Sequence, residues 1–252
     1  MKRLWKFSAG VFYLTKYFCE ITFVVIELTE RGIAMNKDLT AKSWPQTMEK
    51  IRTCHLSLIG TKVKVSEWKE AFDSLVASIK EERKSYPEFA SEITDLTDAT
   101  GSTYDFYDIL EEYFDYLEEN HSWQLVIDSC DEIMPLFKWD SKKPSEYMFR
   151  KGNALEKMGH IEEAEEFGQE WLKKYPDDLY AVASNVFLMI EMKRFDKAEE
   201  LTKKYLKEDL ICDKDSDTFF MAAYRLYEKT DDINAKKRVE TKIAEYNKLM
   251  ER

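Results

Sequence analysis

A chain of 252 residues is long enough to bury a sizeable core, as one large or two small domains. Glycine (7 residues) and proline (5 residues) are scarce, so the sequence provides little of the turn chemistry that a many-stranded β-fold requires. The net charge of −11 argues against nucleic acid as the main partner, because phosphate binding requires clustered Lys and Arg side chains.

The charge is unevenly distributed along the chain. Residues 1–70 contain twelve Lys and Arg against seven Asp and Glu, so the acidic excess lies in residues 71–252. Such an acidic body suits a basic partner and suits an anionic membrane poorly. The cysteines are widely spaced without a C-x-x-C pair, which indicates buried free thiols in a reducing cytosol. They are Cys19, Cys54, Cys130 and Cys212.

Residues 1–34 are apolar in places but do not form a membrane span. Charged residues interrupt the segment, so no run approaches the roughly 18 uncharged residues that a spanning helix needs. Glu30-Arg31-Gly32 can be encoded by a purine-rich string of codons that resembles a bacterial ribosome-binding site, two codons before Met35. We therefore expect Met35 to be the true start. The alternatives are an amphipathic membrane-surface helix or an ordinary first helix.

Residues 35–100 are expected to form a separate N-terminal helical region. The sequence predicts helices at 43–60 and from Ser66 to about Ser85, with one apolar face on the second. Two helices joined by a short loop resemble a DNA-binding pair in outline, but the acidic residues of the second helix would be repelled by phosphates. The polar stretch 87–105 then predicts a boundary, with a repeat domain over 101–252.

An internal repeat is the most informative feature of the sequence. At a spacing of 34 residues, 159–166 (GHIEEAEE) matches 193–200 (KRFDKAEE), and 171–175 falls on 205–209. These residues resemble the tetratricopeptide repeat (TPR) family, whose unit is a pair of antiparallel helices. The resemblance implies an all-α fold: antiparallel helix pairs stacked as a short right-handed TPR-like solenoid, preceded by an N-terminal helical pair.

The best repeat unit is 145–178. Gly152 and Ala164 occupy small positions where two helices approach closely, Gly159 forms the turn between them, and Pro176 ends the second helix. Trp171 departs from the family, which prefers a small residue there, and predicts wider packing. Weaker units are predicted at 107–140, 179–210 and 216–250.

Catalytic chemistry is not indicated anywhere in the sequence. His55, His121 and His160 belong to no spaced metal set, and the last two are expected in equivalent turns between helices. No phosphate-binding loop or nucleophile motif is present. We expect neither an enzyme nor a bound cofactor or metal.

The resemblance instead implies a binding face, because the first helix of each TPR unit lines the concave surface. We expect this surface to be acidic at the first unit and aromatic at the third, so that it binds a protein or peptide and can accept a basic segment. We therefore predict that the protein is a non-catalytic adaptor in the bacterial cytoplasm. The alternative is a regulator that senses a peptide or another ligand. The predicted residues are Glu111, Glu112, Asp115, Glu118, Phe149, Arg150, Asn153, Tyr180 and Phe187.

Overall fold

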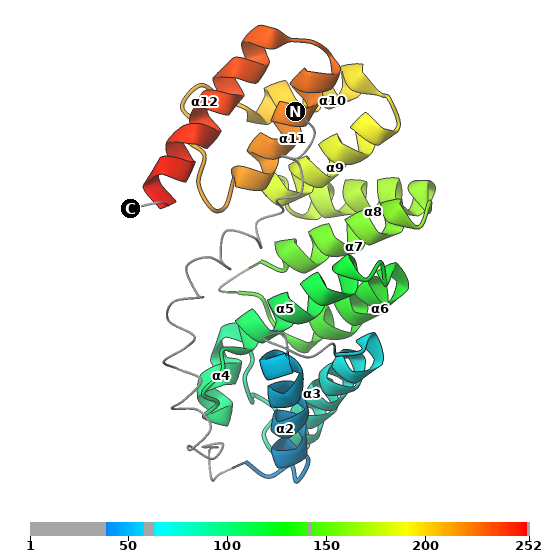
Figure 1. Ribbon diagram of the computed structural model, residues 1–252, viewed down its shortest axis with the longest axis vertical. Helices are drawn as coiled ribbons and strands as arrows, with labels where there is room; N and C mark the ends of the chain where they lie inside the picture. Colours follow the sequence, from blue (N-terminus) through cyan, green and yellow to red (C-terminus); the bar gives the residue numbers. More distant parts are fainter. Residues whose placement is uncertain (1–38, 58–62, 141–142, 251–252) are drawn as a thin grey trace. The chain divides into compact units, whose positions relative to one another are not determined.

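The computed structural model describes residues 39–57, 63–140 and 143–250, so the predicted leader and Met35 lie outside the described residues. Every regular element in these ranges is a helix (Figure 1). The chain divides into two compact units, which are described separately below. Unit 1 comprises residues up to Ser122 together with Pro135–Ser141, and unit 2 comprises Trp123–Met134 and the remainder from Lys142. The predicted division at residue 101, which follows the sequence repeat, stays a prediction.

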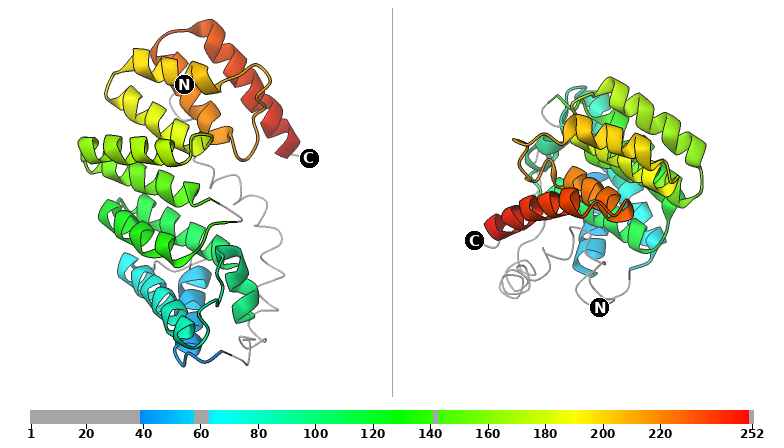
Figure 2. Two further views of the ribbon diagram at one scale, coloured as in Figure 1. Left: turned by 180° about the vertical axis from the view of Figure 1, so that it is seen from behind. Right: turned by 90° about the horizontal axis from the view of Figure 1, so that it is seen from above.

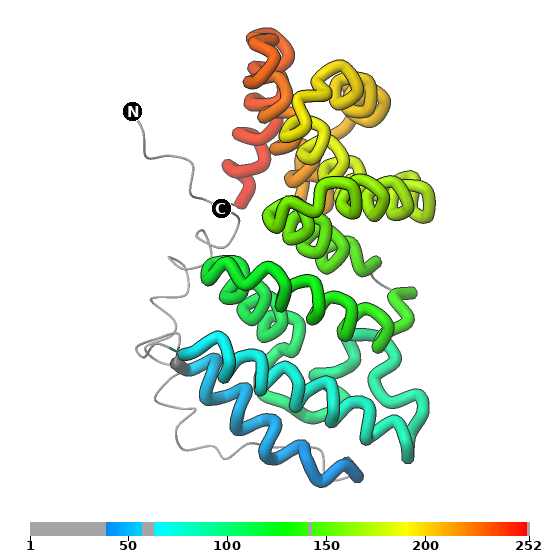
Figure 3. The backbone as a smooth tube through the Cα atoms, turned by 90° about the vertical axis from the view of Figure 1, so that its right-hand side faces the viewer, coloured from blue at the N-terminus to red at the C-terminus, as the bar shows by residue number. Residues whose placement is uncertain are grey.

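Unit 1 is built around a helical pair. Helix α2 (Trp44–Ser57) packs along α3 (Val65–Ser85), as Figure 3 shows. Helix α3 buries one apolar face, at the spacing predicted from the sequence, because Trp68, Phe72 and Leu75 recur every three to four residues. The short elements η1 (Ile93–Asp95) and α4 (Leu96–Thr100) follow, and α5 (Phe106–Glu119) packs against the pair. The N-terminal helical pair is therefore confirmed.

A buried carboxylate fixes the start of α2 in unit 1. The side chain of Glu82 in α3 is 1% exposed and accepts hydrogen bonds from two backbone N–H groups, Thr40 N (2.9 Å) and Ala41 N (2.8 Å). The hydroxyl of Thr40 (2.9 Å) and the indole Nε1 of Trp44 (3.0 Å) donate to the same carboxylate. Burial raises the pKa of Glu82, but these hydrogen bonds outweigh it, so the pKa lies below its usual value.

Unit 2 consists of helices in sequence-adjacent pairs. After α6 (Trp123–Ile133) and the short η2 (Met134–Leu136), the pairs are α7 (Ser145–Lys157) with α8 (Ile161–Lys174), α9 (Leu179–Glu191) with α10 (Phe195–Tyr205), and α11 (Asp217–Lys229) with α12 (Ile233–Met250). The first helices of successive pairs also pack together, with α9 between α7 and α11 (Figures 1 and 2). The all-α class and the TPR-like helix pairs are thus confirmed.

The turns that follow α5, α7, α9 and α11 share one backbone conformation. The second residue after each of these helices has a left-handed φ, and the next N–H bonds the carbonyl five residues back, as in a Schellman motif. The left-handed residues are His121 (φ 54°), Gly159 (78°), Lys193 (57°) and Asp231 (55°). His121 therefore corresponds in position to Gly159, and His160 is the residue that follows Gly159, so both histidines lie in turns of the same kind, as expected from the sequence.

Small residues allow the helices of unit 2 to approach closely, as the repeat predicted. A Cβ atom added to Gly152 would lie 3.1 Å from Ser184 Oγ on α9, and Ala164 is 4% exposed. Gly168, which the repeat pattern did not single out, is equally constrained. Its added Cβ would lie 3.0 Å from Asn185 Oδ1, and its carbonyl accepts a hydrogen bond from Asn185 Nδ2 (2.9 Å). The crossing of α8 and α9 thus depends on a glycine.

The large side chain of Trp171 is buried and makes a specific hydrogen bond. The side chain is 1% exposed, and its Nε1 donates to Asp178 Oδ2 at 3.0 Å. Asp178, itself 5% exposed, also accepts from Ser145 Oγ (2.6 Å) and from the backbone N–H of Tyr180 (3.1 Å). One carboxylate therefore joins the start of α7, the end of α8 and the start of α9. The indole of Trp171 is held in place by its buried hydrogen bond to Asp178.

Candidate interaction face

The first helices of the three pairs in unit 2 present a row of side chains that contact one another. Tyr180 and Phe187 lie two turns apart on α9, and Phe149 of α7 meets both rings edge-on, with centroids 6.1 Å and 6.3 Å away. On the other side, the guanidinium of Arg225 on α11 lies 5.9 Å from the Phe187 ring. We call this surface the three-helix face. Its residues are Glu146, Phe149, Arg150, Tyr180, Phe187, Thr218, Met221 and Arg225.

The aromatic side chains of this face are only partly covered. Phe149 and Phe187 pack against the buried core of α9, α11 and α12, yet each keeps part of its surface exposed, as does Tyr180. Met221 lies one turn from both Thr218 and Arg225 on α11 and is 38% exposed. These side chains are held in place by the core on one side and are exposed to solvent on the other. Such a surface can bind an apolar side chain of a partner.

Both arginine side chains on the three-helix face form ion pairs with carboxylates. Arg150 Nη2 lies 3.1 Å from Glu146 Oε1 within α7. Arg225 pairs with Glu191 of α9. Because both guanidinium groups are paired, they add little net positive charge to the face.

The surroundings of Tyr180 are acidic. Burial, together with the negative charges of Asp217, Glu146 and Asp215, raises the pKa of Tyr180 to about 12. Burial also raises the pKa of Asp217, with Asp213 and Asp215 acting in the same direction. Carboxylates thus gather near Tyr180, and among them Asp217 is partly buried and forms no ion pair with another described residue.

The structure brings together part of the predicted site. Phe149 contacts both Tyr180 and Phe187, Arg150 is the residue after Phe149, and Asn153 is half-buried one turn further along α7. The predicted acidic residues lie on α5 in unit 1, where Glu112 Oε2 is 2.7 Å from His55 Nδ1. The other three, Glu111, Asp115 and Glu118, also make interactions of their own. A groove joining the acidic and aromatic parts stays a prediction.

Sequence reasoning missed the contribution of α11. Thr218 contacts Tyr180, and Arg225 contacts Phe187. In both contacts the two residues are 38 positions apart in the sequence. The left-handed residues Lys193 and Asp231 have the same separation. A search at 38 as well as 34 residues would have placed Thr218, Met221 and Arg225 on this face.

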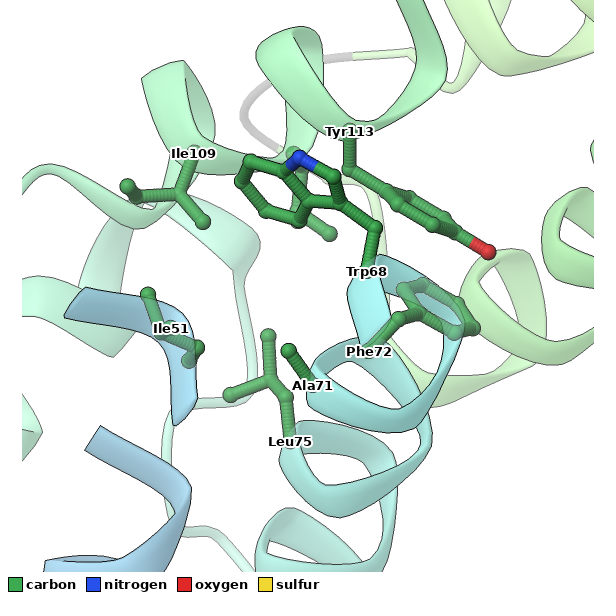
Figure 4. A pocket seen from close by; sticks show the side chains of 8 residues that line it. Ile51, Trp68, Ala71, Phe72, Leu75, Ile109 and Tyr113 are labelled. Carbon is green, nitrogen blue, oxygen red and sulfur yellow. The ribbon is translucent and has the colours of Figure 1, made fainter. Parts of the chain in front are cut away.

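A second candidate, an apolar pocket in unit 1, lacks the features of a ligand site. Figure 4 shows it between α2, α3 and α5, lined by Ile51, Trp68, Ala71, Phe72, Leu75, Leu110, Ile109 and Tyr113. It has room for about one water molecule. Trp68 Nε1 is buried there without a hydrogen-bond partner, and the lining otherwise offers no polar surface to orient a ligand.

Reactive groups are not assembled in the described parts of the chain. Burial raises the pKa of both Cys54 and Cys212 to about 11, which keeps these thiols protonated and unreactive near neutral pH. Among the residues that the structure describes, no three His, Cys, Asp or Glu side chains form a metal-binding group. In the same ranges, every helix is too short or too polar to cross a membrane.

Comparison with known proteins gives no family assignment. No family model and no curated protein matches the chain. Among solved structures, one titled "MamA RS-1 ArsTM double mutant" is 14% identical, covers 83% of this chain and 97% of its own, and has a TM-score of 0.41. Another is PilW, described as a widely conserved type IV pilus biogenesis factor. It is 16% identical, covers 78% of this chain and 91% of its own, and has a TM-score of 0.38. Both scores are below 0.5, so neither likeness carries an argument.

Proposed function

We propose that this protein is a non-catalytic interaction module that holds a segment of another protein against the three-helix face of unit 2. The observation that carries the proposal is the contact between Phe149, Tyr180 and Phe187, which come from two different helices and remain partly exposed. Aromatic side chains fixed in this way are the usual anchors of protein interfaces. A cytoplasmic location belongs to the same proposal.

The geometry of the face favours a peptide segment over a small molecule. Its side chains are three to four residues apart on α7 and α11 and seven residues apart on α9, so the surface extends along the helices and across the boundaries between pairs. The apolar pocket described above lies in unit 1 and has room for about one water molecule, which is too little for a small ligand. An extended segment can place one apolar side chain beside Met221 and Phe187 and continue along the row.

The proposal is tested by selecting displayed random peptides of about twelve residues on the full chain. Binding of the enriched peptides is then measured by fluorescence anisotropy. Met221→Gln keeps the length of the side chain but makes it polar. We expect it to weaken binding about fivefold to tenfold, which corresponds to about 1 kcal/mol of lost apolar contact.

Ile233→Gln is the matched control, because Ile233 is 77% exposed at the start of α12, away from the three-helix face. It should leave affinity unchanged. The proposal fails if no peptide is enriched, or if the enriched peptides bind wild type and Met221→Gln equally well.

A further inference from the structure

The segment before α11 carries an unbalanced negative charge. Asp213, Asp215 and Asp217 lie within five residues, and Lys214 is the single cation among them. Within the described residues, none of the three carboxylates forms an ion pair. Asp213 accepts from Ser216 Oγ (2.6 Å), and Asp217 accepts from Thr218 Oγ1 (3.2 Å).

Helix α11 compensates only part of this charge. The start of a helix is equivalent to about half a positive charge, so Lys214 and α11 together leave the three carboxylates in excess. Burial, with a smaller effect of the Asp213 and Asp215 charges, raises the pKa of Asp217, so its folded environment disfavours the ionised form. A charge that is partly desolvated and unpaired lowers the stability of the fold, and a bound cation would relieve this cost.

The carboxylates lie at one end of the aromatic row. Asp217 and Asp215 act electrostatically on Tyr180, whose half-buried ring lies beside Phe149. The opposite end, near Phe187, is electrically balanced because Arg225 is paired with Glu191. The three-helix face therefore has an acidic end at Tyr180 and a neutral end at Phe187, and the exposed Met221 lies between Thr218 and Arg225 on α11.

We infer that the partner segment places a Lys or Arg next to an apolar residue, with the cation beside Asp215, Asp217 and Tyr180 and the apolar side chain against Met221 and Phe187. This inference rests on the proposed function and names its occupant from charge complementarity. Carboxylates and an aromatic ring together attract an ammonium or guanidinium group, by ion pairing and by the cation–π interaction. An acidic segment would be repelled.

The test uses the same displayed peptides and the full chain. Peptides enriched on wild type should contain Lys or Arg next to an apolar residue more often than the starting library does. Asp215→Asn/Asp217→Asn should weaken their binding about tenfold, because the cation loses its counter-charges. Raising the ionic strength from about 0.05 M to about 0.5 M should weaken binding to wild type and have much less effect on the double variant.

The matched control is Glu166→Gln/Glu170→Gln, which removes two negative charges from exposed positions on α8. It should leave affinity unchanged, and the thermal midpoint of the Asp215→Asn/Asp217→Asn variant should be no lower than that of wild type. Enriched peptides without an excess of basic residues would overturn the inference and leave the proposed function standing. Equal binding by the Asp215→Asn/Asp217→Asn variant would do the same. A selection that enriches no peptide would overturn both.

Discussion

Replacing Glu82 by glutamine tests the carboxylate that anchors the start of α2. The Glu82 side chain receives four donor groups on two oxygens, and glutamine keeps only one of those acceptors. At least one or two buried donors lose their partner, and each costs about 1–3 kcal/mol. We therefore expect Glu82→Gln to lower the free energy of unfolding of unit 1 by about 2–5 kcal/mol at neutral pH.

The pH dependence gives this prediction a second, independent readout. The folded-state pKa of Glu82 is lowered, so its stabilising contribution is present above the unfolded-state pKa and is lost as pH falls through the folded value. The difference between wild type and Glu82→Gln should be constant at neutral pH and should shrink below about pH 4.5. Raising the pH above neutral should not change this difference in the free energy of unfolding.

Urea unfolding followed by circular dichroism gives the stability, and hydrogen exchange over residues 40–57 locates the effect. Glu81→Gln is the control, because Glu81 is the preceding residue, is half-exposed and pairs only with Lys84 at the surface. A loss of less than about 0.5 kcal/mol in Glu82→Gln, or an equal loss in both variants, would refute the reasoning.

Two further substitutions test unit 2, each by thermal or urea unfolding. Lys193→Gly should stabilise by about 0.5–1 kcal/mol, because Lys193 has a left-handed φ of 57° that glycine adopts without strain; Lys197→Gly, inside α10, should instead destabilise by about 1 kcal/mol. Thr202→Val should stabilise by about 1 kcal/mol, because the Thr202 hydroxyl is buried without a hydrogen-bond partner. Thr241→Val, at an exposed hydroxyl, should change little, and a marked loss in Thr202→Val would show that its hydroxyl is bonded.

Local patterns were enough to predict the helices and their pairing. Gly152, Gly159 and Ala164 carry the close approaches and the turn of one pair, and a spacing of 34 residues extends this pattern to the next pair. These features depend on residues that are neighbours in sequence or on one helix. The left-handed turn at Lys193 has no glycine, so its conformation follows from the helices on either side and was not readable from residue type.

Long-range polar contacts could not be predicted. Glu82 meets Thr40 from 42 residues away, and nothing in either neighbourhood distinguishes this carboxylate from the solvated ones around it. The acidic surroundings of Tyr180 were missed for the same reason, since Asp217 belongs to another helix pair. Charge counts indicated an acidic protein, but only the packing of α9 and α11 shows which carboxylates face an aromatic ring.

The carboxylate of Asp178 has a consequence for how unit 2 unfolds. In a simple stack of repeats, each helix pair can open with only its interface to the next pair resisting. Here one buried side chain bonds the beginning of α7, the end of α8 and the beginning of α9 at the same time. Opening either pair leaves a desolvated charge in the other, so the two pairs are energetically coupled. Unit 2 should therefore behave over α7–α9 as one cooperative block, with fraying confined to its outer helices.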